Sequence, residues 1–186
     1  MSSRWLVLAL SWMALPSATL RSSYLPPQYL PIYGGGGGSG YTRSCGAGKV
    51  LTGLTGRTGL LLDAVGVLCR PVSSTGVLGS ESTVGTLVGG AGGTSGSAKC
   101  SSGKVVSSAR IWHGMYVNGV AVSCQAWSTQ TRSFSGPSES HVLGNGTQTA
   151  LTSSTESCEA PTQPANGIRG RAHSLVDAVG FICNEP

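Results

Sequence analysis

The sequence predicts an all-β domain in which three related repeats pack together as a barrel or prism with threefold pseudosymmetry. Three observations support this prediction: the composition, the spacing of the cysteines, and the similarity of the segments that the cysteines enclose. The chain of 186 residues contains 29 glycines and only 10% charged residues, and Val and Thr are common. Such a composition favours strands joined by many turns, and no long window has helical periodicity.

The N-terminal residues have the layout of a secretory signal peptide, which we place at residues 1–19. Arg4 provides a positive charge, residues 5–15 form an apolar run, and small residues follow at 17–19. A run this short does not span a bilayer, which needs about 20 apolar residues. Because no second apolar run follows, we expect a secreted, extracellular protein without a membrane span.

Residues 20–40 are rich in Tyr, Pro and Gly and are open to two interpretations. One is an extended tail with a flexible glycine hinge. The other is a first strand and a glycine loop that belong to the fold. Residues 41–186 form the predicted domain, a single β-prism domain of three repeats at about 41–90, 91–140 and 141–186.

The six cysteines all follow the leader and predict a disulfide framework. They fall into three pairs, namely Cys45 and Cys69, Cys100 and Cys124, and Cys158 and Cys183. Because the spacings within and between the pairs are nearly constant, we predict one disulfide in each repeat. Each would close a loop of about 25 residues and stabilise the fold by about 3 kcal/mol in the chain-entropy model. We expect no metal, because zinc sites need closely spaced cysteines or nearby histidines.

Short apolar alternations bounded by glycine predict two strands within each enclosed segment. In the first segment we expect strands at 49–54 and 61–68 around a turn at 55–59. Residues 117–124 and 175–183 repeat the second of these strands. Equivalent positions before the closing cysteines hold Asp63, Asn118 and Asp177 and, further upstream, Arg57, Trp112 and Arg171.

Charge and motifs exclude several function classes. The formal net charge is +5 and the basic residues are scattered, so we expect no nucleic-acid partner. The sequence has no nucleophile elbow, zinc-protease helix or phosphate-binding loop, and we predict no enzymatic activity and no cofactor. Asn145 begins an Asn-Gly-Thr sequon, which we expect to carry a glycan in an exported protein.

The stretch from Gly56 to Val67, GRTGLLLDAVGV, resembles the sugar-binding loop of jacalin-related lectins. The stretch from Gly170 to Gly180, GRAHSLVDAVG, resembles a second copy. The paired-cysteine repeats also resemble the vitelline-membrane outer-layer protein. These resemblances imply a β-prism of three four-stranded Greek-key sheets in a pseudo-threefold arrangement.

The resemblance to the lectins also implies a set of carbohydrate-binding residues. In that family a G-x-x-x-D loop holds sugar hydroxyls through backbone N–H groups and the Asp carboxylate, and a glycine-rich loop approaches from a neighbouring connection. The first segment matches this motif in full, whereas His173 replaces the glycine of the third and Asn118 replaces the aspartate of the second. The candidate carbohydrate-binding residues are Gly59, Leu61, Leu62, Asp63, Gly90, Gly92, Asn118, Ser174, Leu175 and Asp177.

Pseudosymmetry pairs each candidate with a glycine-rich connection: 89–93 would face Asp63, 144–146 would face Asn118, and 34–38 would face Asp177. Arg57 and Arg171 have two interpretations, as residues that line the site or as ion-pair partners of the nearby aspartates. Trp112 either stacks on a sugar ring or fills the gap where the other repeats carry arginine. We place Trp127 in the core.

We therefore predict a secreted, non-enzymatic lectin that recognises mannose- or galactose-type glycans. Several sites on one chain, or a homo-oligomer, would raise avidity without new contacts. The alternative function is a structural or adhesive component of an extracellular coat, with the same fold and no sugar binding. In that alternative the Tyr/Pro/Gly segment serves as an interaction arm.

Overall fold

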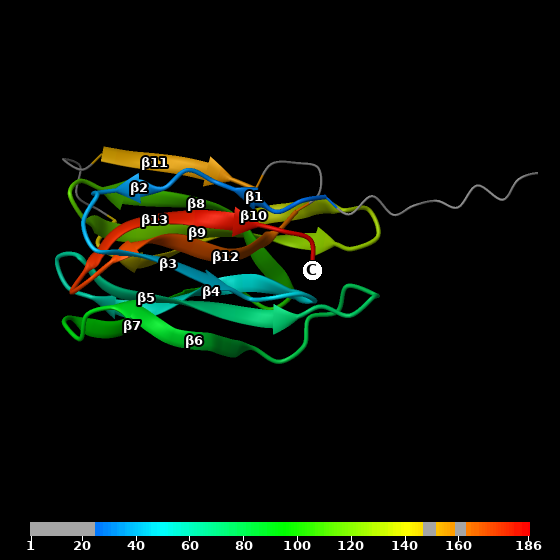
Figure 1. Cartoon of the computed structure of the whole chain (residues 1–186). Coiled ribbons are helices and arrows are strands. Elements are labelled where there is room, and N and C mark those ends of the chain that lie inside the picture. The colour runs from blue at the N-terminus through cyan, green and yellow to red at the C-terminus, as the bar shows by residue number, and fades with distance from the viewer. Residues whose placement is uncertain (1–24, 147–151, 159–162) are drawn as a thin grey trace, which may run out of the picture.

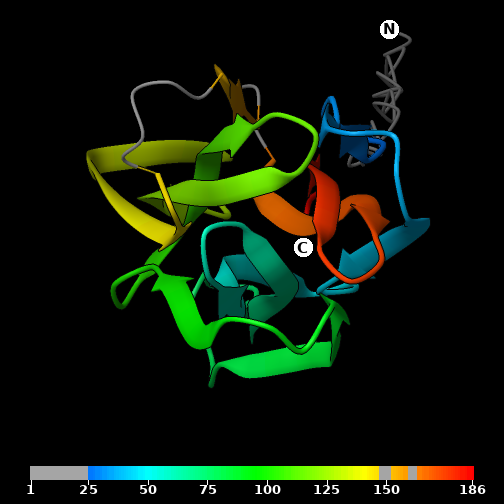
Figure 2. The same ribbon diagram turned by 90° about the vertical axis from the view of Figure 1, so that its left-hand side faces the viewer.

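The computed structural model describes residues 25–146, 152–158 and 163–186, and the predicted signal peptide lies outside these ranges. Three antiparallel sheets surround one axis, and Figure 2 looks along that axis. The predicted all-β prism is therefore confirmed. Within the described ranges, no helix has the length and apolar character needed to cross a membrane.

The three sheets share one strand order (Figure 1). Sheet I contains, in spatial order, β1 (Gln28–Tyr29) with β2 (Tyr33–Gly34), then β13 (Val176–Cys183), β12 (Ala165–Ala172) and β3 (Ser39–Ser44). Sheet II contains β6 (Ser82–Gly89), β5 (Leu62–Pro71), β4 (Lys49–Thr58) and β7 (Thr94–Lys99). Sheet III contains β10 (Ser133–Gly144), β9 (Val117–Ser128), β8 (Lys104–His113) and β11 (Thr152–Ser157). Each sheet is a central hairpin flanked by two outer strands, which is the Greek-key order.

Sheet I joins the two ends of the described chain. β1 and β2 both pair with β13, so together they occupy the place that β6 and β10 take in the other sheets. On the other side of the hairpin, β3 pairs with β12 along its whole length. The described part of the Tyr/Pro/Gly segment is therefore part of the fold, as the second interpretation held.

The predicted turn at 55–59 is wrong, because β4 continues to Thr58 and the chain reverses only at 59–61. The glycines that suggested a turn have another role. The backbone of Ala64 crosses so close to Gly56 that a Cβ there would collide with its carbonyl oxygen. Glycine inside a strand thus marks a close approach of two backbones at this position.

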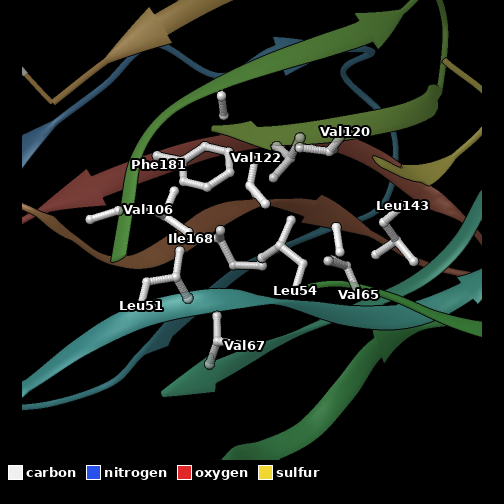
Figure 3. Close-up of a cluster of buried hydrophobic side chains, with 14 of the residues drawn as sticks. Leu51, Leu54, Val65, Val67, Val106, Val120, Val122, Leu143, Ile168 and Phe181 are labelled. Atoms are coloured by element: carbon white, nitrogen blue, oxygen red, sulfur yellow. The ribbon is translucent and has the colours of Figure 1, made fainter. Parts of the chain in front are cut away.

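Apolar side chains from all three sheets meet on the axis of the prism (Figure 3). Leu54 and Val65 come from sheet II, Val120 and Leu143 from sheet III, and Ile168 from sheet I. All five are at most 2% exposed. Because every sheet contributes to one cluster, no sheet can bury its apolar face without the other two. Trp127 is not among these core residues, which corrects its predicted place.

The three disulfides pair as predicted, but each one joins two neighbouring sheets. Cys45 directly follows β3 of sheet I, and its partner Cys69 lies in β5 of sheet II. Cys100 follows β7 and bonds Cys124 in β9, so it joins sheets II and III. The bond from Cys158, after β11, to Cys183 in β13 returns to sheet I. Each cysteine repeat therefore begins at the edge of one sheet and ends inside the next. Together the three bonds link the three sheets in a ring around the axis.

A charged cluster near the second disulfide makes stability depend on pH. Lys104 donates to the Glu139 carboxylate at 2.8 Å and the Ser101 amide donates at 2.6 Å. The hydrogen bond from Lys104, followed by that from Ser101, lowers the Glu139 pKa from 4.5 to about 2. A depressed carboxyl pKa stabilises the fold above the unfolded pKa, and this contribution is lost as pH falls toward 2.

We therefore expect Glu139→Gln to lower the melting temperature at pH 7 and to match the wild type near pH 2. Thermal unfolding followed by circular dichroism between pH 2 and 7 measures this difference. A difference in melting temperature that stays constant over the whole range contradicts the assignment.

Candidate functional site

Three hairpins and three glycine-rich connections gather at one end of the prism, which faces the viewer in Figure 2. The hairpin turns have the same hydrogen bond: the amide of Gly59 donates to Leu61, that of Gly114 to Tyr116, and that of His173 to Leu175, at 2.9–3.0 Å. Neither Gly59 nor Gly114 has a positive φ. His173 therefore takes the position of the motif glycine without backbone strain.

Each glycine-rich connection is tied to the hairpin of its own sheet. The amide of Gly90 donates to the Asp63 carbonyl at 2.8 Å, that of Gly35 to the Asp177 carbonyl at 2.9 Å, and that of Asn145 to the Asn118 carbonyl at 3.0 Å. The residue before each donor, Gly34, Gly89 or Gly144, has a positive φ between 93° and 132°. The three predicted pairings of loop and acidic or amide residue are therefore correct.

Two aspartate carboxylates lie directly against the glycine loops. A Cβ on Gly92 would collide with Oδ1 of Asp63, and a Cβ on Gly93 would lie 2.5 Å from its Oδ2. Gly37 and Gly38 have the same relation to the two oxygens of Asp177. Only glycine leaves room for a backbone this close to a carboxylate. Peptide N–H groups and an acidic group are thereby concentrated in one small region.

An arginine fixes each of these two loops. Arg57 donates from Nε to the Gly92 carbonyl and from Nη2 to the Gly93 carbonyl, both at 2.7 Å. Arg171 makes the same pair of 2.7 Å bonds to the carbonyls of Gly37 and Gly38. In the described ranges neither arginine forms an ion pair with its aspartate, so that interpretation is wrong. The two arginines act on the loop backbone, and the planar guanidinium suits this two-pronged contact.

Arg57→Ala is expected to loosen the loop at Asp63 and leave the loop at Asp177 unchanged. Losing two charge-assisted bonds at an exposed site should cost about 1 kcal/mol, and 1.4 kcal/mol corresponds to a tenfold change in an opening equilibrium. Hydrogen exchange of the Gly90 amide should therefore accelerate by about fivefold. The Gly35 amide, which Arg171 still supports, is the internal control. Equal acceleration of both amides, or none, contradicts this role.

The two aspartates differ in burial. Asp177 is 6% exposed, and its Oδ2 is buried without a hydrogen-bond partner, whereas Asp63 is half-buried. A buried carboxylate oxygen without a partner is costly for the folded state. Asp177 therefore has an unused capacity to accept a hydrogen bond.

The third equivalent position, in sheet III, is built differently. Trp112 replaces the arginine, and its ring lies so close to Gly146 that a Cβ there would collide with it. The Arg110 guanidinium lies 5.2 Å from the centroid of the same ring. Trp112 therefore packs against the loop, in agreement with its gap-filling interpretation. Asn118 holds Asn145 through its backbone carbonyl and brings no carboxylate.

The other predicted site residues occupy varied positions. Leu62 is 0% exposed and belongs to the core, so its side chain is excluded from a surface site. Gly59 is exposed beside Asp63, and Leu61 and Leu175 are half-buried in the turns. The Ser174 carbonyl lies against Gly90, the loop of sheet II. Ser174 therefore borders the Asp63 site, although its own hairpin carries Asp177.

Sequence reasoning missed the corresponding neighbour of the Asp177 site. The Met115 carbonyl, from the hairpin of sheet III, lies against Gly35. Each site thus has three walls: its glycine loop, its own hairpin and the hairpin tip of the adjacent sheet. Met115 is 80% exposed and Leu60 is 78% exposed at these tips. A signal was present in the sequence, because Met115 stands three residues before Asn118 just as Ser174 stands three residues before Asp177. It predicts this contact only when the order of the sheets around the axis is known.

Two of the three histidines lie in sheet III, and His173 lies in the hairpin turn that precedes Asp177. His113 contacts Ser154 at 3.1 Å, and His141 contacts Glu139 at 3.2 Å, both in sheet III. Burial lowers the pKa of His113. Cys124, Glu139 and His141 approach one another, but the Cys124 sulfur is bonded to Cys100.

No protein-family model and no curated protein matches this sequence. Solved lectin structures match its fold. Malaysian banana lectin superposes with a TM-score of 0.56 at 17% identity, over 87% of this chain and 100% of that one. A mannose-specific jacalin-related lectin from Morus nigra, solved with mannose, has a TM-score of 0.57 at 14% identity, over 90% of this chain and 100% of that one. A mannose-binding jacalin-related lectin from Ananas comosus has a TM-score of 0.54 at 21% identity, over 86% of this chain and 99% of that one. The chain therefore has the jacalin β-prism fold.

Proposed function

We propose that this chain is a secreted, non-enzymatic carbohydrate-binding protein with two sites, at Asp63 and Asp177. One observation carries the proposal: the same construction occurs twice. In both copies a glycine loop lies against an aspartate carboxylate, and an arginine holds that loop with two 2.7 Å bonds. Among the described residues, neither carboxylate forms an ion pair that would explain its place in the fold. Its repetition beside an exposed loop indicates a binding role.

The chemistry of this arrangement suits vicinal hydroxyls. An ionised carboxylate accepts two short, charge-assisted hydrogen bonds, and neighbouring hydroxyls of a sugar ring supply two such donors. Loop amides donate in return to ring and hydroxyl oxygens. The arginines keep the loop in place before the ligand arrives, which reduces the entropy lost on binding.

Three solved lectins with this fold are described as mannose-binding or mannose-specific, or contain mannose. We therefore extend the proposal to mannose-type glycans as the first ligand class to test. A shallow single site of this kind binds in about the millimolar range, near −4 kcal/mol. Both sites open at the same end of the prism (Figure 2), so two branches of one glycan can engage together and raise avidity.

The coat-component alternative loses part of its support. It used the Tyr/Pro/Gly segment as a free arm, but residues 28–29, 33–34 and 39–44 pair as strands of sheet I. The described part of that segment is therefore committed to the prism.

Isothermal titration with methyl α-mannoside, preceded by a glycan array, tests the proposal. We expect two binding events per chain, and the same two for Asn118→Ala, because Asn118 brings no carboxylate to the third position. An array without signal for any mannose- or galactose-type glycan, from a correctly folded sample, contradicts the function. A single event assigns sugar binding to one aspartate only.

A further inference from the structure

A cavity of about 230 Å³ lies at the opposite end of the prism, away from the glycine loops. Its walls come from the connection after β5, the end of β9 with the following turn, and the residues after β13, beside the C-terminus marked in Figure 1. Val72, Ser73, Trp127, Thr129, Arg132 and Glu185 are among its lining residues. None of these residues takes part in the two aspartate sites.

Two polar groups in this cavity have unused hydrogen-bonding capacity. The indole Nε1 of Trp127 and the hydroxyl of Thr129 are buried without a hydrogen-bond partner. Such a group costs roughly 1–3 kcal/mol when it is left unsatisfied. The indole N–H only donates, whereas the hydroxyl both donates and accepts. A matching ligand therefore accepts a hydrogen bond from the indole N–H and either donates to the Thr129 hydroxyl or accepts from it. Two adjacent hydroxyls can do both.

Two charged side chains that line the cavity form an ion pair. Arg132 Nη1 lies 3.2 Å from the Glu185 carboxylate, and the Glu185 side chain is 8% exposed. Arg132 has a φ of 50°, and it is the one non-glycine residue with positive φ among those described. Arg132 ends the turn between β9 and β10, and a left-handed residue is common at this place in a hairpin. Because each of these two charges already has a partner, neither side chain requires a charged ligand.

We propose that this cavity is a second type of ligand site, which takes a single neutral, polyhydroxylated ring such as one sugar residue. Its volume is below the roughly 300–1,000 Å³ of pockets for drug-sized molecules, which restricts the ligand to about one ring. Val72 and the Trp127 ring provide apolar surface for the C–H face of that ring. The indole N–H and the Thr129 hydroxyl are buried in this structure, and a small shift of the two side chains brings them to the hydroxyls of the ring.

Such a site has a functional consequence that the aspartate sites alone do not provide. Ligands at opposite ends of the prism allow one chain to bridge two glycans without oligomerising. This bridging role rests on the proposed function, whereas the cavity site itself does not, because its residues are separate from Asp63 and Asp177.

The Trp127 indole N–H resonance reports occupancy directly. We would titrate ¹⁵N-labelled full-length protein, as recovered from the medium, with methyl glycosides of mannose, galactose and N-acetylglucosamine, and assign the indole signal with Trp127→Phe. We expect a saturable shift of this resonance with at least one glycoside. Thr129→Val should abolish it, whereas the matched variant Thr131→Val, in the exposed turn next to it, should retain it.

The double variant Asp63→Ala/Asp177→Ala separates the two kinds of site, because it should keep the Trp127 shift. The proposal is overturned if no glycoside moves the Trp127 resonance in a saturable way. A shift that survives in Thr129→Val, or that disappears in the aspartate double variant, overturns it as well. Thermal unfolding of each variant confirms that the fold is intact.

Discussion

The double variant Asp63→Ala/Asp177→Ala is expected to bind mannosides at least about a hundredfold more weakly than the wild type at the glycine-loop end. Each aspartate offers a charged acceptor, and a hydrogen bond to a charged group contributes about 1.5–3 kcal/mol. Losing two such bonds per site removes most of a millimolar affinity. Titration calorimetry of the wild type, both single variants and the double variant measures this effect.

The single variants serve as matched controls for each other. Asp63→Ala should retain the event at Asp177, and Asp177→Ala should retain the event at Asp63. Asp177→Ala should also keep or raise the melting temperature, because it removes a buried carboxylate oxygen that has no partner. If the double variant binds as many mannosides per chain as the wild type, with unchanged affinity, the carboxylates have no part in recognition.

Removing one disulfide is expected to have the largest effect on stability. The Cys100–Cys124 bond closes a loop with a sequence separation of 24 residues and joins sheets II and III. Its loss should lower the free energy of unfolding by about 3 kcal/mol, a large part of the 5–15 kcal/mol typical of a domain. Denaturant unfolding of Cys100→Ala/Cys124→Ala, compared with the wild type, measures the change.

The pseudosymmetry of the disulfides extends this prediction. Cys45→Ala/Cys69→Ala and Cys158→Ala/Cys183→Ala remove bonds of nearly equal loop length that join the other two pairs of sheets. All three double variants should therefore lose similar free energy. A change below about 0.5 kcal/mol in any of them would contradict a ring of three equivalent clamps.

The sequence predicted the disulfides and the loop pairings because both depend on spacing along the chain. Constant separations between cysteines identified the repeat, and the order of loops placed 89–93 at Asp63. These relations hold in any structure in which the three repeats are equivalent. They required no knowledge of where one sheet ends and the next begins.

The sequence did not predict features that depend on the offset between repeat and sheet. The cysteine repeat crosses from one sheet to the next, so the repeat does not show which sheets are neighbours at the loop end. There the hairpin tip of one sheet contacts the glycine loop of another, as Ser174 does at Gly90 and Met115 at Gly35. The glycines of β4 indicated a turn, because a close backbone approach and a turn have the same local signal. Trp127 lies near the end of β9, and the sequence does not show whether an apolar residue there faces the axis of the prism or a cavity at its end.

The location of a bound monosaccharide tests the central claim most directly. A crystal structure of the protein with methyl α-mannoside should show one ring beside the Asp63 carboxylate and another beside that of Asp177. Their hydroxyls should lie within hydrogen-bonding distance of the carboxylates and of the amides of the two glycine loops. Mannoside bound elsewhere on the prism, with both carboxylates unvisited at saturating ligand, would contradict the claim.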